Sequence, residues 1–196
     1  MRVVLATANP GKQREFAALL EPHGLELVLQ SALGITSIPE TGRTFEDNAV
    51  LKARHAASAG LPSLADDSGL EVDALGGRPG VWSARFAGPA ASDEDNNSEL
   101  LRALKDVPDE RRTARYRCVL ALLRSATEAQ PLIAQGSWEG RIAHQRAGLG
   151  GFGYDSCFIP AGFDCTAAEL SPARKNALSH RGSALRELVA RLDSWR

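Results

Sequence analysis

Two adjacent carboxylates, Asp66 and Asp67, follow a short apolar run in the middle of the first half of the chain. The next residues, Ser68-Gly69, are typical of a turn, so the sequence predicts a strand over 64–67 that ends in a loop. A carboxylate at the end of a strand can bind a metal ion or activate water, although a solvated turn is the ordinary alternative. Because neighbouring side chains of a strand point to opposite faces, we expect only one carboxylate to reach a given site.

Two lysines and one further acid could complete a phosphate-binding site. Lys12 follows the turn Asn9-Pro10-Gly11 at the predicted start of a helix, where free backbone N–H groups and the helix dipole favour anions. Lys52 lies in a second predicted helix, and Glu40 with Asp67 could hold a divalent cation that shields phosphate oxygens. Single lysines and acids of this kind are usually solvated, so only their proximity in space would assign them to one site.

The elements that must position these residues follow from hydrophobic periodicity, which predicts a mixed α/β fold. The expected strands are 2–7, 25–29, 64–67, 116–123 and 132–143, the last interrupted near Gly136 and Gly140. The expected helices are 12–20, 44–59 with a capping box at its start, one capped by Ser92 to Asp95, and a C-terminal helix with Leu185, Leu188, Leu192 and Trp195 at helical spacing.

Composition limits the classes of function. Residues 1–196, of which 43% are hydrophobic and 24% charged, are expected to form a single domain with two lobes. No apolar run approaches the roughly 18 residues of a membrane span, and the N-terminus does not resemble a signal peptide, so we expect a cytoplasmic protein without membrane contact. The net charge of −1 argues against a nucleic-acid partner. Arginines cluster between 111 and 117, but Arg115 and Arg117 alternate with Tyr116 and Cys118, which favours a solvated sheet face. The three cysteines form no metal or disulfide pattern, which favours small buried residues.

Two glycine patterns do not indicate nucleotide-binding motifs of known type. Residues 148–153 match G-x-G-x-x-G, but the residues that follow are extended and end in Pro160 rather than forming a helix. Gly11-Lys12 is similar to part of a P-loop, yet Gln13 stands where Ser or Thr would bind magnesium.

Five blocks of sequence, in this order, resemble the inosine triphosphate pyrophosphatase family. They are Thr7 to Phe16, Glu40 to Ala53, Ala65 to Gly80, Gly150 to Asp155 and Ser179 to Leu185. The blocks span almost the whole chain, and the departures from the family pattern are small, with Ser156 in place of a usual proline and Asp47 in place of a common glutamate.

The resemblance implies a fold, an activity and a site. The fold would be an elongated mixed β-sheet flanked by helices, in two lobes with an active-site cleft between them. The protein would be a homodimer that uses Mg²⁺ to hydrolyse deaminated purine nucleoside triphosphates, such as ITP, dITP and XTP, to the monophosphate and pyrophosphate. Carried over by motif, Asp67 would be the general base and a metal ligand, and Glu40 a second metal ligand. Substrate contacts would be Thr7, Ala8, Asn9, Pro10, Gly11, Lys12, Lys52 and Ser68 on the phosphates, and Phe152, Gly153, Tyr154, Asp155, Lys175, Ser179, His180 and Arg181 on the base.

The chemistry of the residues agrees with these implied roles. Hydrolysis that releases pyrophosphate needs positioning, neutralisation of phosphate charge and activation of water, and carboxylates with lysines supply all three. Donors such as Arg181, Lys175 or backbone N–H groups can pair with the 6-oxygen of hypoxanthine or xanthine but not with the amino group of adenine. His180 could contact the base or donate a proton. A pyrophosphatase for another nucleoside triphosphate and a non-catalytic nucleotide sensor remain alternatives.

Overall fold

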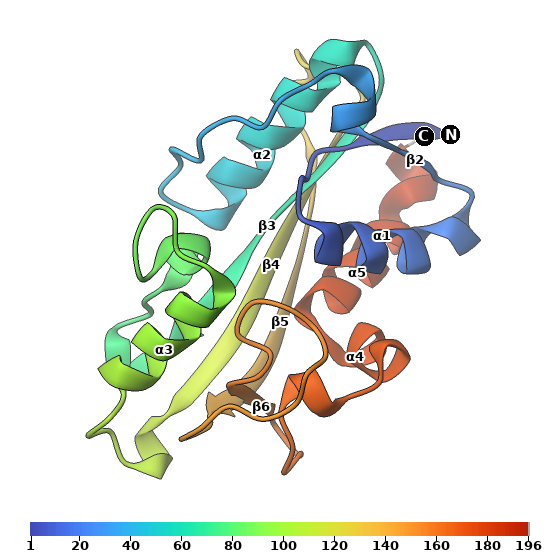
Figure 1. Ribbon diagram of the computed structural model, residues 1–196. Coiled ribbons are helices and arrows are strands. Elements are labelled where there is room, and N and C mark those ends of the chain that lie inside the picture. Colours follow the sequence, from blue (N-terminus) through green and yellow to red (C-terminus); the bar gives the residue numbers. More distant parts are fainter. Residues whose placement is uncertain (196) are drawn as a thin grey trace. The chain divides into compact units, whose positions relative to one another are not determined.

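The computed structural model of the protein describes residues 1–195. It contains a six-stranded β-sheet (Figure 1). Its strands are β1 (Arg2–Leu5), β2 (Glu26–Leu29), β3 (Ser63–Val72), β4 (Thr113–Leu123), β5 (Leu132–Ile142) and β6 (Phe158–Pro160). They are arranged in the order β2-β1-β3-β4-β5-β6. Strand β1 is parallel to β2 and β3, whereas β5 is antiparallel to β6. The predicted α/β fold with a mixed sheet is therefore confirmed.

The helices are α1 (Pro10–Leu20), α2 (Phe45–Ala56), α3 (Asp93–Ala103), α4 (Pro172–Leu178) and α5 (His180–Trp195). Capping side chains accept hydrogen bonds from backbone N–H groups at the starts of α1 to α4. Capping boxes at Thr44 and Ser92 start α2 and α3 as predicted. Helix α1 begins two residues earlier than expected because Asn9 caps it and Pro10 fits its first turn. Helix α4 was not predicted.

The strand that carries the two carboxylates is longer than predicted. Strand β3 continues through Ser68-Gly69, so the expected turn is wrong and Asp66 and Asp67 lie in the middle of a strand. Leu70 and Val72, which follow, are fully buried in a hydrophobic cluster. Their burial gives the chain a reason to remain extended beyond the polar residues.

The predicted interruption of the 132–143 strand is also wrong, because β5 runs without a break. A Cβ atom at Gly140 would lie only 2.4 Å from the backbone oxygen of Ile159 in β6. The glycine therefore permits a close approach of the neighbouring strand rather than ending β5.

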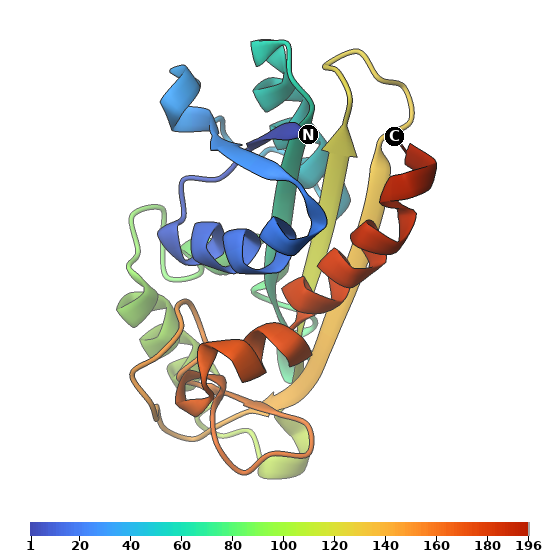
Figure 2. The same ribbon diagram turned by 90° about the vertical axis from the view of Figure 1, so that its right-hand side faces the viewer.

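The chain divides into two compact units. The first unit comprises 1–67, 118–136 and 181–196, and the second comprises 68–117 and 137–180. In the first unit, α1 and α5 pack on one face of the sheet (Figure 2) through Phe16, Leu20, Leu185 and Leu188. The opposite face of the same part of the sheet carries α2, whose Ala49, Ala53 and Ala56 are fully buried (Figure 1). The single two-lobed domain expected from the sequence stays a prediction.

The second unit has its own core, which combines aromatic and aliphatic side chains. Tyr116, Trp138, Tyr154 and Phe158 pack with Leu70, Val72, Leu100 and Leu104. Arg115 and Arg117 alternate in β4 with the buried Tyr116 and Cys118 as predicted, and both are half-buried. Buried Arg112 also belongs to this unit. Its guanidinium donates hydrogen bonds to the backbone oxygens of Leu104, Ile142 and Ala143 at 2.7 to 2.8 Å. Arg112 thus joins three segments of the second unit.

The cysteines and the apolar content of the helices were the remaining features considered in the sequence. Cys118 and Cys157 are buried free thiols, as predicted, and Cys165 is half-buried. Within residues 1–195, no helix has the length and apolar composition that a membrane span requires.

Candidate active site

The two neighbouring carboxylates of β3 form ion pairs with different basic side chains of the first unit. Asp66 and Asp67 are 1% and 5% exposed. One Asp66 oxygen lies 2.9 Å from Lys12 Nζ and 3.2 Å from Arg181 Nη2. Asp67 Oδ1 instead lies 2.8 Å from Lys52 Nζ. The strand alternation predicted from the sequence is confirmed, because the two carboxylates have separate sets of partners.

Lys52 joins two acids that lie far apart in the sequence. Its Nζ atom is 2.6 Å from Glu40 Oε1 and 2.8 Å from Asp67 Oδ1. Asn48, one helical turn before Lys52, donates from Nδ2 to Asp67 Oδ2 at 3.1 Å and accepts from the backbone N–H of Gly42 at 2.7 Å. A Cβ at Gly42 would lie 2.9 Å from the backbone nitrogen of Asn48, so glycine is needed for this close approach. Helix α2 thereby places the Lys52 ammonium group between the carboxylates of Glu40 and Asp67.

Burial and charge set the proton affinities of this cluster. Burial raises the pKa of Asp67, and Glu40 raises it further, against the opposing effect of Lys52. Burial would also raise the pKa of Glu40, but Lys52 lowers it below its ordinary value. Although burial disfavours a charged lysine, Asp67, Asp66 and Glu40 raise the pKa of Lys52 to about 12. Asp67 is therefore a stronger base than an ordinary aspartate, beside a lysine that stays cationic.

The Glu40 and Asp67 carboxylates form a donor set that fits a hard divalent cation. Mg²⁺ in proteins is commonly held by one or two carboxylates, with substrate phosphates and waters as its other ligands. These two carboxylates already converge on the single positive charge of Lys52. Among residues 1–195, no group of three or more His, Cys, Asp or Glu side chains is arranged to hold a metal ion. The two carboxylates could serve as the protein ligands of a metal ion that also binds phosphate and water.

Lys12 lies at the start of α1, in a turn that is closed by hydrogen bonds. Asn9 Oδ1 accepts from the backbone N–H of Lys12, and the Asn9 N–H donates to Thr7 Oγ1, each at 3.1 Å. Gln13 Nε2 donates to the backbone oxygen of Thr7, also at 3.1 Å. These contacts fold residues 7–12 around the N-terminus of α1, where the positive end of the helix dipole favours an anion.

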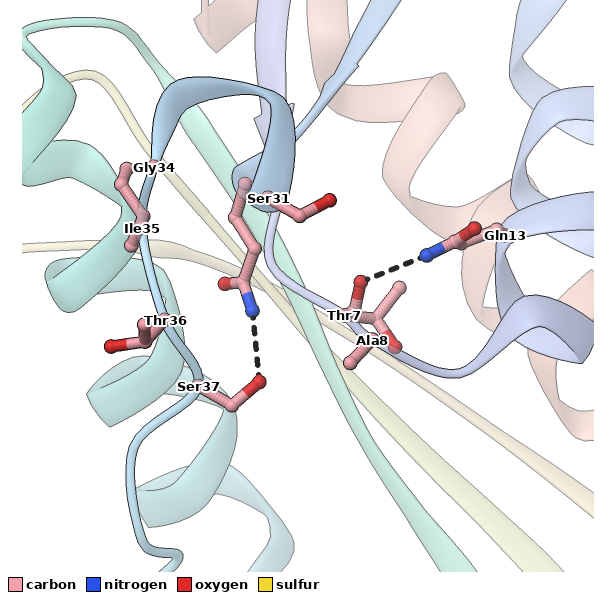
Figure 3. Close-up of a pocket in the computed structure, with 9 residues that line it drawn as sticks. Thr7, Ala8, Gln13, Ser31, Gly34, Ile35, Thr36 and Ser37 are labelled. Atoms are coloured by element: carbon pink, nitrogen blue, oxygen red, sulfur yellow. Dashed lines mark hydrogen bonds between the residues drawn. The ribbon is translucent and has the colours of Figure 1, made fainter.

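A pocket of about 460 Å³ adjoins the same turn (Figure 3). Thr7, Ala8 and Gln13 line one side, and Gln30, Ser31 and residues 34–37 line the other. Gln30 Nε2 donates to Ser37 Oγ at 3.1 Å across this second side. The described lining offers hydroxyl and carboxamide groups and no charged side chain.

The second unit contains a separate group of aromatic and charged side chains. Lys175 Nζ lies 2.6 Å from Asp155 Oδ2 and 4.6 Å from the centre of the Phe152 ring. The Tyr116 hydroxyl donates to Asp155 Oδ1 at 3.3 Å, and its ring stacks on His180 with centroids 4.6 Å apart and planes 7° apart. The group combines flat apolar surfaces with a buried ion pair, which suits recognition of a planar polar ring.

The Asp155 carboxylate also organises the glycine-rich loop before it. Gly151 has a φ of 73°, and a Cβ there would lie 2.0 Å from Asp155 Oδ2. Gly153 donates to Asp93 Oδ2 at 2.6 Å and accepts from Asn97 Nδ2 at 2.7 Å. Gly153, at the end of the loop, is therefore held within the second unit, and the G-x-G-x-x-G match forms bends and turns rather than a helix start.

The predicted site residues fall into two sets. The first unit holds Thr7, Ala8, Asn9, Pro10, Gly11, Lys12, Glu40, Lys52, Asp67 and Arg181, and the second holds Ser68, Phe152, Gly153, Tyr154, Asp155, Lys175, Ser179 and His180. Sequence reasoning assigned no role to Asn48, Tyr116 or Glu15. The spacing of Asn48 from Lys52 could have indicated the first, but no local pattern marks the other two.

Comparison with known proteins gives a consistent result. Residues 3–191 match the Ham1 family. A dITP/XTP pyrophosphatase of Pectobacterium atrosepticum is 57% identical over 189 residues, which cover 96% of each chain. One of Methylococcus capsulatus is 56% identical over 192 residues, covering 97% of this chain and 96% of the relative. The solved structure of a HAM1 protein from Coxiella burnetii is 45% identical, with a TM-score of 0.91 over 99% of both chains.

Proposed function

Because the chain belongs to the Ham1 family, we propose that it performs the reaction for which its relatives are named. The resemblance drawn from the five sequence blocks is confirmed. The protein is a nucleoside triphosphate pyrophosphatase that hydrolyses deaminated purine nucleoside triphosphates, dITP, ITP and XTP, to the monophosphate and pyrophosphate. The observation that carries this conclusion at the site is the convergence of Glu40 and Asp67 on Lys52.

We propose that Asp67 is the general base and that Glu40 and Asp67 hold Mg²⁺. The raised pKa of Asp67, caused by burial and by Glu40, suits a carboxylate that accepts the proton of the attacking water. When bound, Mg²⁺ would neutralise charge on the phosphate oxygens and make pyrophosphate a better leaving group. Asn48 keeps the Asp67 carboxylate oriented through its 3.1 Å hydrogen bond.

The triphosphate is assigned to residues 7–12, Lys52 and Ser68. The positive end of the α1 dipole lies at this capped turn, and Lys12 adds a full positive charge. Lys52 remains protonated throughout the physiological range, because the surrounding carboxylates raise its pKa to about 12. Together these groups supply the charge that a transferring phosphoryl group requires.

The purine base is assigned to residues 152–155, Lys175, Ser179, His180 and Arg181. The Phe152 ring offers a stacking surface, and Lys175 beside it can donate to a 6-oxygen. The amino group of adenine would place a donor against these donors, which disfavours ATP. His180, stacked on Tyr116, is proposed as a base contact, with proton donation as the alternative.

The remaining assignments concern the protein's surroundings. We propose a cytoplasmic homodimer whose partner is the small-molecule substrate, without binding to nucleic acid or membranes. Two observations support the absence of nucleic-acid binding. The net charge is −1, and Arg115 is paired with Asp73 and Glu139 at 2.9 and 3.0 Å. A protein that binds nucleic acid usually presents a dense basic face instead.

A panel of nucleoside triphosphates tests the proposed activity. The purified protein is incubated with ITP, dITP, XTP, the common ribonucleotides and dTTP, with Mg²⁺ or with EDTA, and monophosphate and pyrophosphate are quantified. We expect the largest kcat/KM for ITP, dITP and XTP and a requirement for Mg²⁺. Preference for a pyrimidine nucleotide would favour a pyrophosphatase that acts on another nucleoside triphosphate. Binding of ITP without release of pyrophosphate would favour a non-catalytic nucleotide sensor.

A further inference from the structure

Glu15 is a buried carboxylate to which the proposed mechanism assigns no role. It lies one helical turn after Lys12 in α1 and is 9% exposed, beside the fully buried Phe16. An ionised carboxylate in such a position is costly unless it is paired with a cation. Its presence on the apolar side of α1 therefore needs an explanation from its partners.

The partner of Glu15 is Arg181 at the start of α5, 166 residues away in the sequence. Arg181 Nη1 contacts Glu15 Oε2, and Arg181 Nη2 lies 3.2 Å from Asp66 Oδ2. The same Asp66 oxygen lies 2.9 Å from Lys12 Nζ. The four side chains form a row of alternating charges, Glu15, Arg181, Asp66 and Lys12, whose formal charges sum to zero.

We propose that Glu15 is a positioning residue for Lys12, acting through Arg181 and Asp66. The proposal rests on the proposed function in one respect, namely that Lys12 binds the phosphates of the substrate. All four residues belong to the first unit. Glu15 contributes no contact of its own to the substrate in this account.

The direction of the effect follows from the sharing of Asp66. Arg181 and Lys12 both bind Asp66 Oδ2, and Glu15 binds the other Nη atom of Arg181. Without the Glu15 charge, Asp66 is the remaining carboxylate in this row that is paired with Arg181. The attraction between Arg181 and Asp66 then draws the Asp66 carboxylate away from Lys12. Lys12 then loses the contact that fixes its ammonium group. Displacement of a positioning group by about 1 Å can cost about 100-fold in rate.

The pKa shifts of the two central side chains, Asp66 and Arg181, favour their charged forms. Burial would raise the pKa of Asp66, but Lys12 and Arg181 hold it well below its ordinary value. Burial would lower the pKa of Arg181, but Asp66 and Glu15 raise it above its ordinary value. Arg181 can also serve the base as proposed above, because a guanidinium carries five N–H donors.

A double-mutant cycle tests whether Glu15 acts through Lys12. The variants are Glu15→Gln, Lys12→Ala and the two combined, with ITP hydrolysis as the assay and inhibition by inorganic tripolyphosphate as a second measurement of phosphate binding. Glu26→Gln is the matched control, because Glu26 is paired with Arg2 at 3.4 Å on the surface with a side chain 67% exposed. Thermal unfolding of each variant is recorded.

We expect Glu15→Gln to lower kcat/KM for ITP by about 100-fold and to weaken inhibition by tripolyphosphate. In the Lys12→Ala background, the same substitution should change either quantity by less than about threefold. Glu15→Asp, which keeps the charge, should recover part of the loss, and Glu26→Gln should match the wild type. If Glu15→Gln does not fold, the cycle is run with Glu15→Asp, whose smaller loss should likewise vanish in the Lys12→Ala background.

Two results would overturn the proposal. One is a double variant whose fold-loss in kcat/KM equals the product of the fold-losses of the two single variants. This would mean that Glu15 acts independently of Lys12. The other is wild-type kcat/KM in Glu15→Gln. Failure of the proposed function itself looks different, because the wild-type protein would then fail to release pyrophosphate from ITP.

Discussion

Replacing Lys52 with methionine would remove the cation that joins the two acids of the site. The carboxylates around Lys52 raise its pKa from 10.5 to about 12, which corresponds to about 2 kcal/mol of stabilisation of the folded state. Because the pKa is higher in the folded protein, this stabilisation is fully present below about pH 10.5 and is lost as pH rises through the folded value. At neutral pH, Lys52→Met should therefore lower the free energy of unfolding by about 2 kcal/mol, or the melting temperature by about 4 to 8 °C.

The same substitution should change the pH dependence of catalysis. Lys52 opposes the rise in the pKa of Asp67, so its removal should raise that pKa further. The acidic limb of the kcat/KM profile for ITP, which reports the free enzyme, should move to higher pH, and the maximum should fall by about 100-fold or more. Lys105→Met, at an exposed lysine, is the control. An unchanged acidic limb together with unchanged stability would refute this view of the cluster.

Three further substitutions test other parts of the account. Arg181→Ala should reduce the ratio of kcat/KM for ITP to that for ATP, because a donor to the 6-oxygen is lost, and an unchanged ratio would contradict its assignment to the base. Gly151→Ala should raise KM for ITP by about tenfold or more, since its Cβ would displace the Asp155 carboxylate, and steady-state kinetics with wild-type KM would show that the loop tolerates it. Because the Asp66 pKa is lowered in the folded state, its contribution to stability should be present above about pH 4 and lost at lower pH. The difference in unfolding free energy between wild type and Asp66→Asn should shrink as pH falls, and urea titrations showing a constant difference would contradict the ion pairing.

Local patterns predicted several of the elements in both units that position the candidate site residues. The capping sequences at Thr44 and Ser92, and the helical spacing of Leu185, Leu188 and Leu192, depend only on residues within one or two turns of one another. Strand alternation likewise separated the partners of Asp66 from those of Asp67. These predictions succeeded because short-range geometry determines them.

Predictions failed where distant packing decided the outcome. The Ser68-Gly69 sequence is typical of a turn, but burial of Leu70 and Val72 keeps β3 extended. Gly140 resembles a strand breaker, but the approach of Ile159 requires a glycine there. No periodicity connects Glu15 with Arg181 across 166 residues, so their ion pair could be found only in the folded structure.

The central claim is that a deaminated purine triphosphate is hydrolysed at the cluster of Glu40, Lys52 and Asp67. Its most direct test is the release of pyrophosphate from ITP by wild type and Asp67→Asn, each with Mg²⁺ and with EDTA, with unfolding measured on the same samples. We predict a Mg²⁺-dependent wild-type activity and a loss of about 100-fold or more in a variant that remains folded. Near-wild-type turnover by folded Asp67→Asn would contradict the claim.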